Sequence, residues 1–324
     1  MISSLSQTIV TGLYRSGTEY IINLIGSHPE LSATMYHINA LRFIKDRFDP
    51  IHKRVNYIKA VHFLSDRSER RYGITFDPDK VVEKLDLYDK VNTCLLYDIV
   101  MTNMHLSGGS AHHWAEKCQL VWREIPYFLR DSSNGYAVHI VRDPRSVLAS
   151  FKKFTNSEYP LYLSSIFNSF DSMSHALKQK DNDRVVILKF EDVLNLKLEE
   201  VSKIWSMIGL SQKDENIFNP DLWLDAYGNK WMSNSLSSPL EPYKFNKKNA
   251  INEWHTGLTP SEIAFTEEIC GELMELFGYE VSGVGSSGKI RNVIYSNHWL
   301  SGLMNQYVEM GEGIQSFPSN PNIV

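Results

Sequence analysis

The chain has few cysteines, and their arrangement suits neither a disulfide framework nor a metal site. The three cysteines among its 324 residues, Cys94, Cys118 and Cys270, are scattered, odd in number and without CxxC spacing. Such cysteines are typical of reduced, structural thiols in a reducing compartment. His112 and His113 have no third ligand at metal spacing, so we expect no metal.

A long apolar segment and a strong charge of one sign are also missing. No apolar run approaches the roughly 20 residues that span a bilayer, and the start, MISSLSQTIVTG, lacks the pattern of a signal peptide. The formal net charge is -5, which disfavours bulk attraction to nucleic acid. We therefore expect a soluble cytoplasmic protein that binds no nucleic acid, and we leave open whether it is a homodimer.

The elements that are present alternate between strands and helices. Apolar, β-branched runs predict buried strands at 7–11, 136–141 and 184–190. Helical patterns are found at 18–27, 147–154, 159–180, 198–208 and 260–277. This order favours an α/β three-layer sandwich with a central, mostly parallel sheet.

Two regions stand apart from this alternation. Residues 36–110 predict a helical insertion, with helices at 78–89 and 93–106, that would form a cap over an acceptor. Residues 281–324 begin with the glycine-rich stretch SGVGSSG and predict a linker and a tail with one short helix. The expected main domain is therefore 1–280.

The segment Gly12–Thr18 (GLYRSGT) connects the first strand to the first helix. Its backbone amides and the positive helix N-terminus would form an anion cradle, and its glycines would let the backbone approach a ligand. The residue after Gly17 is Thr18, not the lysine of the nucleoside-triphosphate loop GxxxxGK[ST], which disfavours Mg-ATP chemistry. The cation lies in the loop instead, at Arg15. A tight strand–helix turn without a ligand is the alternative.

A second anion site is predicted in Ile140–Phe151 (IVRDPRSVLASF). Arg142 lies where a strand ends, and Ser150 follows about two helical turns later. Both can face the carboxyl edge of the sheet, where open α/β folds bind ligands. An arginine fork beside a hydroxyl suits a phosphate.

At these residues the chain resembles the PAPS-dependent sulfotransferases, where PAPS is 3′-phosphoadenosine 5′-phosphosulfate. The resemblance is carried by YRSGT, VRDPRSVLAS and LKFEDVL, with weaker support from WAEK, NEWHTGL and LFGYE, in order over about Thr8–Glu280. It implies a P-loop-like fold and an enzyme that transfers a sulfuryl group from PAPS to a hydroxyl or amine, releases PAP and needs no metal. The acceptor would be a small molecule or a glycan, with a mild preference for carbohydrate.

The resemblance also implies a donor site. Arg15, Ser16, Gly17 and Thr18 would hold the 5′-phosphosulfate, and Arg142 and Ser150 the 3′-phosphate. The wider donor site would add Tyr14, Glu19, Lys247 and Lys248. One departure from the family is Phe190, where many members have tyrosine.

For catalysis the resemblance implies two cations and a base. Arg15 would stabilise the leaving phosphate, with Lys117 as the second cation and Arg123 as its competitor. Lys117 departs from the family in lacking a proline two positions on. His37 is the preferred base, because the usual histidine pKa of about 6.5 suits general-base work near neutrality. His62 and Glu19 remain alternatives for the base.

Two other functions stay open at this point. A P-loop nucleoside or nucleotide kinase would share the glycine loop, although the missing lysine argues against it. A protein that binds PAP or PAPS without catalysis would share both anion sites but lack a working base.

Overall fold

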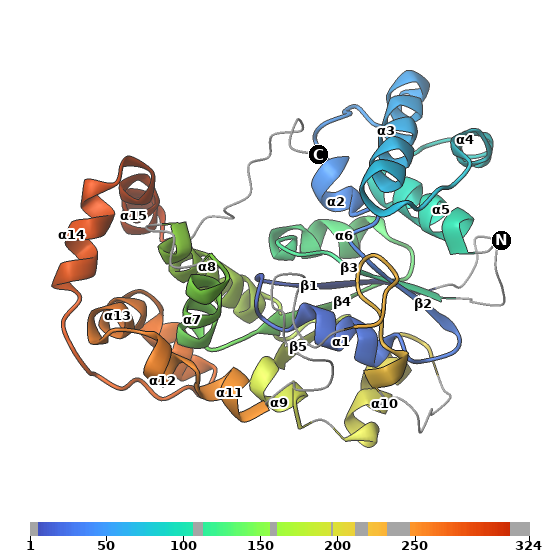
Figure 1. Ribbon diagram of the computed structural model, residues 1–324. Helices are drawn as coiled ribbons and strands as arrows, with labels where there is room; N and C mark the ends of the chain where they lie inside the picture. The colour runs from blue at the N-terminus through green and yellow to red at the C-terminus, as the bar shows by residue number, and fades with distance from the viewer. Residues whose placement is uncertain are drawn as a thin grey trace.

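The computed structural model describes residues 6–105, 113–155, 161–195, 197–210, 220–231 and 247–311. Within them the strands form one sheet in the order β2-β3-β1-β4-β5 (Figure 1). The strands are β1 (Gln7–Gly12), β2 (Leu31–Met35), β3 (His113–Lys117), β4 (Gly135–Val141) and β5 (Val185–Lys189). Every pairing is parallel, and the central strands β1 and β4 are buried almost throughout, as parallel sheets covered on both faces require. The predicted parallel α/β sheet is confirmed.

The register of the sheet brings several strand ends to one edge. Lys117 of β3 lies opposite Val10 of β1 and opposite Met35 of β2, while Gly12 lies opposite Ile140 of β4. Residues that directly follow these strands therefore leave the sheet side by side. This carboxyl edge is where open parallel sheets bind their ligands.

Helices cover both faces of the sheet, because neighbouring strand residues point to opposite sides. Val10 packs in a core with α1 (Thr18–Ile25), the short α9 (Phe190–Val193) and α10 (Leu198–Met207). Ile9 packs in the opposite core, which includes α5 (Thr93–His105), the 3₁₀ turn η1 (Trp122–Glu124) and α6 (Ile125–Asp131). The three-layer arrangement is thus confirmed.

The helical insertion lies between β2 and β3. Its described helices are α2 (Ala40–Phe43), α3 (Arg54–Tyr72), α4 (Pro78–Leu85) and α5, while residues 106–110 of the predicted insertion lie outside the described residues. Helix α4 begins where expected for proline at its first position, with Asp77 accepting hydrogen bonds from the amides of Asp79 and Lys80. Whether this group caps an acceptor stays a prediction.

The later helices pack beside β4 and β5, at the opposite end of the sheet from α2–α5 (Figure 1). They are α7 (Pro144–Phe154), the turn η2 (Leu161–Leu163), α8 (Ser164–Lys178), α11 (Lys247–Asn252), α12 (Trp254–Gly257), α13 (Pro260–Leu276), α14 (Gly288–Ser296) and α15 (His298–Met310). The turn η4 (Pro220–Leu222) does not belong to this group, because the segment that follows it lies against α1, where Asn23 and Leu224 exchange two hydrogen bonds of 3.0 Å. Helix α15 packs back on α8, where the rings of Phe170 and Tyr307 lie 4.9 Å apart. The predicted boundary at residue 280 stays a prediction, and residues 312–324 lie outside the described residues.

The described part of the chain contains no helix that combines the length and the apolarity needed to cross a bilayer. Cytoplasmic location and oligomeric state stay predictions. All three cysteines are buried free thiols. In the same part of the chain, no three histidine, cysteine or acidic side chains are grouped as metal ligands would be.

Candidate active site

The loop from Gly12 to Thr18 forms a tight turn ahead of α1. The carbonyl of Leu13 accepts hydrogen bonds from the backbone amide of Ser16 at 3.1 Å and from its hydroxyl at 2.5 Å. Gly17 has a φ of 91° and lies against Phe190, whose ring would be 2.1 Å from an added Cβ. Gly17 is the N-cap of α1, and no side chain caps this helix. The first amides of α1, beginning at the buried Thr18, are thus available to an anion.

The two predicted anion-binding segments meet directly. Arg15 Nε donates a hydrogen bond to the Ser150 hydroxyl at 2.9 Å. The Arg142 guanidinium donates to the backbone carbonyls of Arg15 and Ala250 and stacks on the Phe190 ring, 4.5 Å from its centroid. The glycine loop, the end of β4 and helix α7 therefore form one continuous polar surface.

Arg142 is buried and Arg15 is partly buried, and one nitrogen of Arg142 has no hydrogen-bond partner. Burial lowers the pKa of Arg142 to about 10, although Glu191 counteracts it, and burial also lowers the pKa of Arg15. A guanidinium with such a pKa is still cationic at neutral pH. Arg142 Nε is buried without a hydrogen-bond partner. A buried, unpaired donor is costly, so an anion bound here would relieve that cost.

Lys117 and Glu19 form an ion pair at the same edge. Lys117 Nζ lies 2.8 Å from Glu19 Oε1, and the lysine side chain is fully buried, 4.1 Å from the centroid of the Tyr36 ring. Burial lowers the pKa of Lys117. Burial alone would raise the pKa of Glu19, but the attraction of Lys117 lowers it overall. An ionised carboxylate that already holds a lysine is a poor proton acceptor near neutrality.

Arg123, the competitor of Lys117, is engaged elsewhere. Its guanidinium forms a two-pronged ion pair with the buried Asp171 of α8, with N–O distances of 2.8 and 2.5 Å. Trp122 Nε1 donates to the same carboxylate at 2.7 Å. Arg123 therefore joins η1 to α8, which leaves Lys117 as the better candidate for the second cation.

His37 lies just beyond the end of β2 with one ring nitrogen held. Its Nε2 is 2.9 Å from the carbonyl oxygen of Ala226, and its Nδ1 is buried without a hydrogen-bond partner. Because a carbonyl only accepts, Nε2 carries the proton and Nδ1 has the free lone pair. Burial lowers the pKa of His37, so the ring is neutral at pH 7. His62, the alternative, is exposed on α3.

Two buried residues that sequence reasoning missed hold the His37 segment. Glu116 accepts from the amides of Ile38 at 2.7 Å and Asn39 at 2.8 Å. Arg67 donates to the carbonyls of Tyr36 at 3.0 Å and His37 at 2.9 Å. The one sequence signal for Glu116 was its place beside Lys117 in WAEK.

The rest of the predicted donor site is placed less fully. Tyr14 accepts a hydrogen bond from Asn168 at 3.2 Å, and its ring lies 4.3 Å from that of Phe151. Lys248 is exposed on α11, and Lys247 is described only as the first backbone position of that helix. Residues 243–246 of the predicted basic loop lie outside the described residues.

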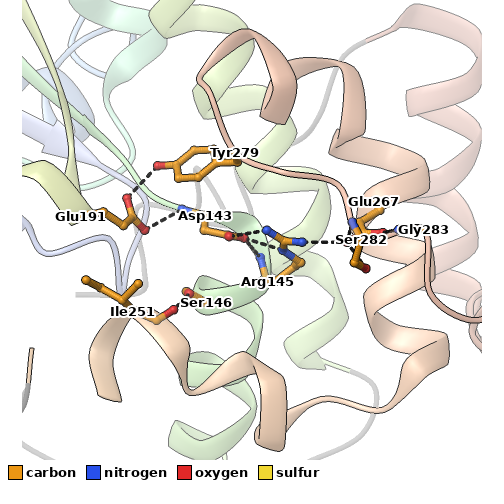
Figure 2. Close-up of polar contacts among 9 residues, drawn as sticks. All are labelled: Asp143, Arg145, Ser146, Glu191, Ile251, Glu267, Tyr279, Ser282 and Gly283. Atoms are coloured by element: carbon orange, nitrogen blue, oxygen red, sulfur yellow. Dashed lines mark hydrogen bonds and ion pairs between the residues drawn. The ribbon is translucent and has the colours of Figure 1, made fainter. Parts of the chain in front are cut away.

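A largely buried network fixes the backbone that follows Arg142, from Asp143 onward (Figure 2). Arg145 bridges Asp143 and Glu267, with N–O distances of 2.7 Å to each. Glu191 accepts from the Asp143 amide at 3.2 Å and from the Tyr279 hydroxyl at 2.8 Å. Tyr279 thus supplies a hydroxyl near the position where Phe190 replaces the family's tyrosine. The strand end that carries Arg142 is held by α7, α9 and α13.

Ser146 fixes α11 to the same region. Its hydroxyl donates to the Ile251 carbonyl at 2.9 Å, as Figure 2 shows. Arg142 binds the neighbouring carbonyl of Ala250. Helix α11, which begins at Lys247, is therefore attached to the polar surface around Arg142 through its backbone.

In this α/β protein the glycine loop and the strand-end arginine are in contact at the carboxyl edge of a parallel sheet. Comparison with known proteins gives the class. The model of the sulfotransferase family matches residues 7–214. The chain therefore belongs to the sulfotransferase family, and it is a sulfotransferase enzyme. The predicted resemblance is confirmed, and this assignment argues against the kinase alternative.

Individual relatives are distant but cover most of the chain. Mouse carbohydrate sulfotransferase 4 is 23% identical over 354 aligned positions, which cover 90% of this chain and 87% of that protein. The sulfotransferase domain of the Synechococcus PCC 7002 olefin synthase has a TM-score of 0.52 at 16% identity and covers 86% of this chain and 96% of that domain. The sulfotransferase domain of the curacin biosynthetic pathway has a TM-score of 0.50 at 15% identity, with 86% and 99% covered. These two structures support the fold.

Proposed function

We propose that this sulfotransferase uses PAPS as its donor and transfers the sulfuryl group to a hydroxyl or amine of a carbohydrate acceptor. The observation that carries the donor assignment is the contact between the two anion-binding segments. Arg15 reaches Ser150, and Arg142 reaches the Arg15 carbonyl. PAPS has two separate anionic ends, the 5′-phosphosulfate and the 3′-phosphate, and therefore needs two such grips in one pocket.

The residues present fit this donor. The glycine loop, with Arg15, Ser16, Gly17 and Thr18, would hold the 5′-phosphosulfate, flanked by Tyr14 and Glu19. Arg142 and Ser150 would hold the 3′-phosphate, and Lys247 and Lys248 would lie near the nucleotide. The buried Arg142 Nε has no hydrogen-bond partner, and the first amides of α1 are not capped by a side chain. Two phosphate groups would accept hydrogen bonds from these nitrogens.

The chemistry is an in-line displacement at sulfur. The acceptor oxygen or nitrogen forms a bond to sulfur while the bond from sulfur to the bridging phosphate oxygen breaks. The negative charge then develops on the leaving phosphate, where Arg15 and Lys117 would stabilise it. Arg15 and Lys117 would thus stabilise the charge on the leaving phosphate, a role that metal ions have in other group-transfer enzymes.

The acceptor's proton would go to His37. Its Nδ1 has the free lone pair, because Nε2 is held by the Ala226 carbonyl. A lowered pKa keeps this nitrogen unprotonated at neutral pH. Glu19 would instead orient Lys117 through their ion pair.

A carbohydrate acceptor is favoured by aromatic rings beside His37. The His37 ring lies 5.0 Å from the ring of Tyr72, which lies 5.7 Å from the half-exposed ring of Tyr227. Rings with one apolar face and a polar edge are suited to stack on sugars. The distant relative named a carbohydrate sulfotransferase points the same way.

Two measurements test this function. Thermal shift with PAP against Mg-ATP reads the donor, and we expect stabilisation by PAP alone. Incubation with labelled PAPS and a glycan library reads the acceptor, and we expect label on at least one glycan. Tight PAP binding with no transfer to any library member would favour the non-catalytic alternative. Stabilisation by Mg-ATP but not PAP would reject the proposed donor.

A further inference from the structure

Three arginines gather around the segment that carries His37. Arg42 belongs to α2, and Arg67 and Arg71 lie in the last two turns of α3. The guanidinium carbons of Arg42 and Arg67 lie 5.1 and 3.9 Å from the centroid of the Phe43 ring. Those of Arg67 and Arg71 each lie 5.7 Å from the centroid of the Tyr72 ring. We call these three residues the arginine cluster.

The cluster brings three positive charges close together. Burial, together with repulsion from Arg67 and Arg71, lowers the pKa of Arg42 to about 10. Within the described residues, neither Arg67 nor Arg71 forms an ion pair with a carboxylate. Glu116 attracts Arg67 without forming an ion pair with it, and its single negative charge can balance only one of the three guanidinium charges. Like charges held together in a partly buried site are unfavourable unless an anion binds there.

Arg67 has a distinct place within the cluster. It is almost fully buried, with 2% of its surface exposed, and its Nη1 is used by the carbonyls of Tyr36 and His37. Its Nε is buried without a hydrogen-bond partner. Arg67 therefore contributes positive charge without reaching the protein surface. Arg42 is partly buried and Arg71 is exposed, so these two side chains can contact a ligand.

The cluster adjoins the proposed reaction centre through one residue. The Tyr36 ring lies 4.1 Å from Lys117 Nζ, and the Tyr36 backbone carbonyl accepts a hydrogen bond from Arg67 Nη1 at 3.0 Å. On the other side, the His37 ring contacts Tyr72, on which Arg67 and Arg71 lie. An acceptor hydroxyl at His37 would therefore place the neighbouring part of the acceptor beside the arginines.

We propose that Arg42 and Arg71, supported by the charge of Arg67, bind an anionic group on the acceptor, so that the enzyme sulfates an acidic saccharide carrying a carboxylate or a sulfate ester. This inference rests on the proposed function. Planar guanidinium forks match both groups in shape and charge. Arg67 of α3 also binds the His37 backbone carbonyl. An anionic group bound by the cluster would therefore fix the acceptor hydroxyl relative to His37.

The test compares matched acidic and neutral saccharides in the presence of saturating PAP. One pair is an unsulfated chondroitin hexasaccharide and its carboxyl-reduced form, and the other is an N-acetyllactosamine oligosaccharide with and without 6-O-sulfate. We expect the acidic member of at least one pair to bind about tenfold tighter or better in calorimetry. The double variant Arg42→Gln, Arg71→Gln should lose this preference.

A neighbouring arginine provides the matched control. Arg70 is exposed on the same helix and donates to the backbone carbonyl of Asp66, so Arg70→Gln should keep the preference for the acidic saccharide. All three proteins should bind PAP equally. Equal binding within both pairs, or a preference that survives in the double variant, would overturn the inference. If the unmodified protein did not bind PAP at all, the proposed donor site would be rejected instead.

Discussion

The guanidinium of Arg142 donates a hydrogen bond to the backbone carbonyl of Arg15, 127 positions earlier in the chain. This bond joins the end of β4 to the glycine loop, and the return contact from Arg15 to Ser150 closes the arrangement. Two motifs that the sequence suggests separately are thus parts of one surface. A PAPS molecule that bridged the two motifs would be bound at each end by residues that also contact one another.

Replacing Arg142 tests this surface most directly. Arg142→Ala removes a buried, charge-assisted donor and should weaken PAP binding by about 1.5–3 kcal/mol, which corresponds to roughly a tenfold to hundredfold rise in Kd. Calorimetric titration with PAP measures the change. Arg130→Ala is the control, because Arg130 is exposed on α6 and contacts only its near neighbours Asp131 and Tyr127 among its described contacts. An unchanged Kd for Arg142→Ala would contradict the proposed donor site.

Replacing His37 tests the proposed base. His37→Ala should lower kcat by about 10²-fold or more while leaving PAP affinity unchanged, because the proposed role of the imidazole is to take the acceptor's proton. His62→Ala, an exposed histidine on α3, should keep normal turnover. Normal kcat in His37→Ala would place the base elsewhere.

The pH profile adds a second test of His37. The base works when neutral, and burial lowers its pKa below the usual value of about 6.5. The rate should therefore stay high as the pH falls to 6.5 and decline only at lower pH, where Nδ1 becomes protonated. A rate that already falls between pH 8 and 7 would mean that another group, with a higher pKa, is the base.

Local sequence patterns were sufficient to predict the strands that consist of apolar runs and the motifs at the ends of those strands. The predicted strand 136–141 is β4, and Asp143 before Pro144 caps α7, accepting from the Arg145 amide at 2.9 Å. These features depend on neighbours along the chain, which the sequence shows directly.

The features that the sequence did not reveal depend on distant partners. Helix α3 is rich in charged residues, so its buried stripe of Tyr57, Val61 and Leu64 was not recognised. In β3, the charged pair Glu116 and Lys117 obscured an interior strand of the sheet. Both charges are buried because residues 77 to 98 positions away satisfy them. No local pattern encodes such a partner.

A buried histidine makes the stability of the fold depend on pH. His139 of β4 is fully buried, its Nε2 lies 2.9 Å from the Ser172 hydroxyl, and burial lowers its pKa to about 3. The unfolded chain binds a proton there below about pH 6.5, whereas the folded chain does not until about pH 3. This residue's contribution to stability is therefore present above pH 6.5 and is lost as the pH falls toward 3.

His139→Gln should remove that contribution to the pH dependence. Between pH 6 and 4 the wild-type free energy of unfolding should fall more steeply than that of the variant, by up to about 1.4 kcal/mol per pH unit. Urea unfolding at each pH gives both slopes. Parallel slopes would mean that His139 is protonated in the folded protein. Because a glutamine can still bond to Ser172, the comparison does not require the loss of that contact.

Glu116 offers the last test, because it would act on the reaction only through the His37 segment that it holds. Glu116→Gln replaces one carboxylate oxygen with an amide nitrogen, which cannot accept from Ile38 or Asn39. Leaving that buried amide unpaired should destabilise the fold by about 1–3 kcal/mol and let His37 move, so kcat should fall while PAP affinity is kept. Tyr97→Phe removes another hydrogen bond to the same carboxylate but leaves both amides paired, so it should retain much more turnover. If the two variants lost stability equally and Glu116→Gln kept full kcat, Glu116 would stabilise β3 without positioning His37.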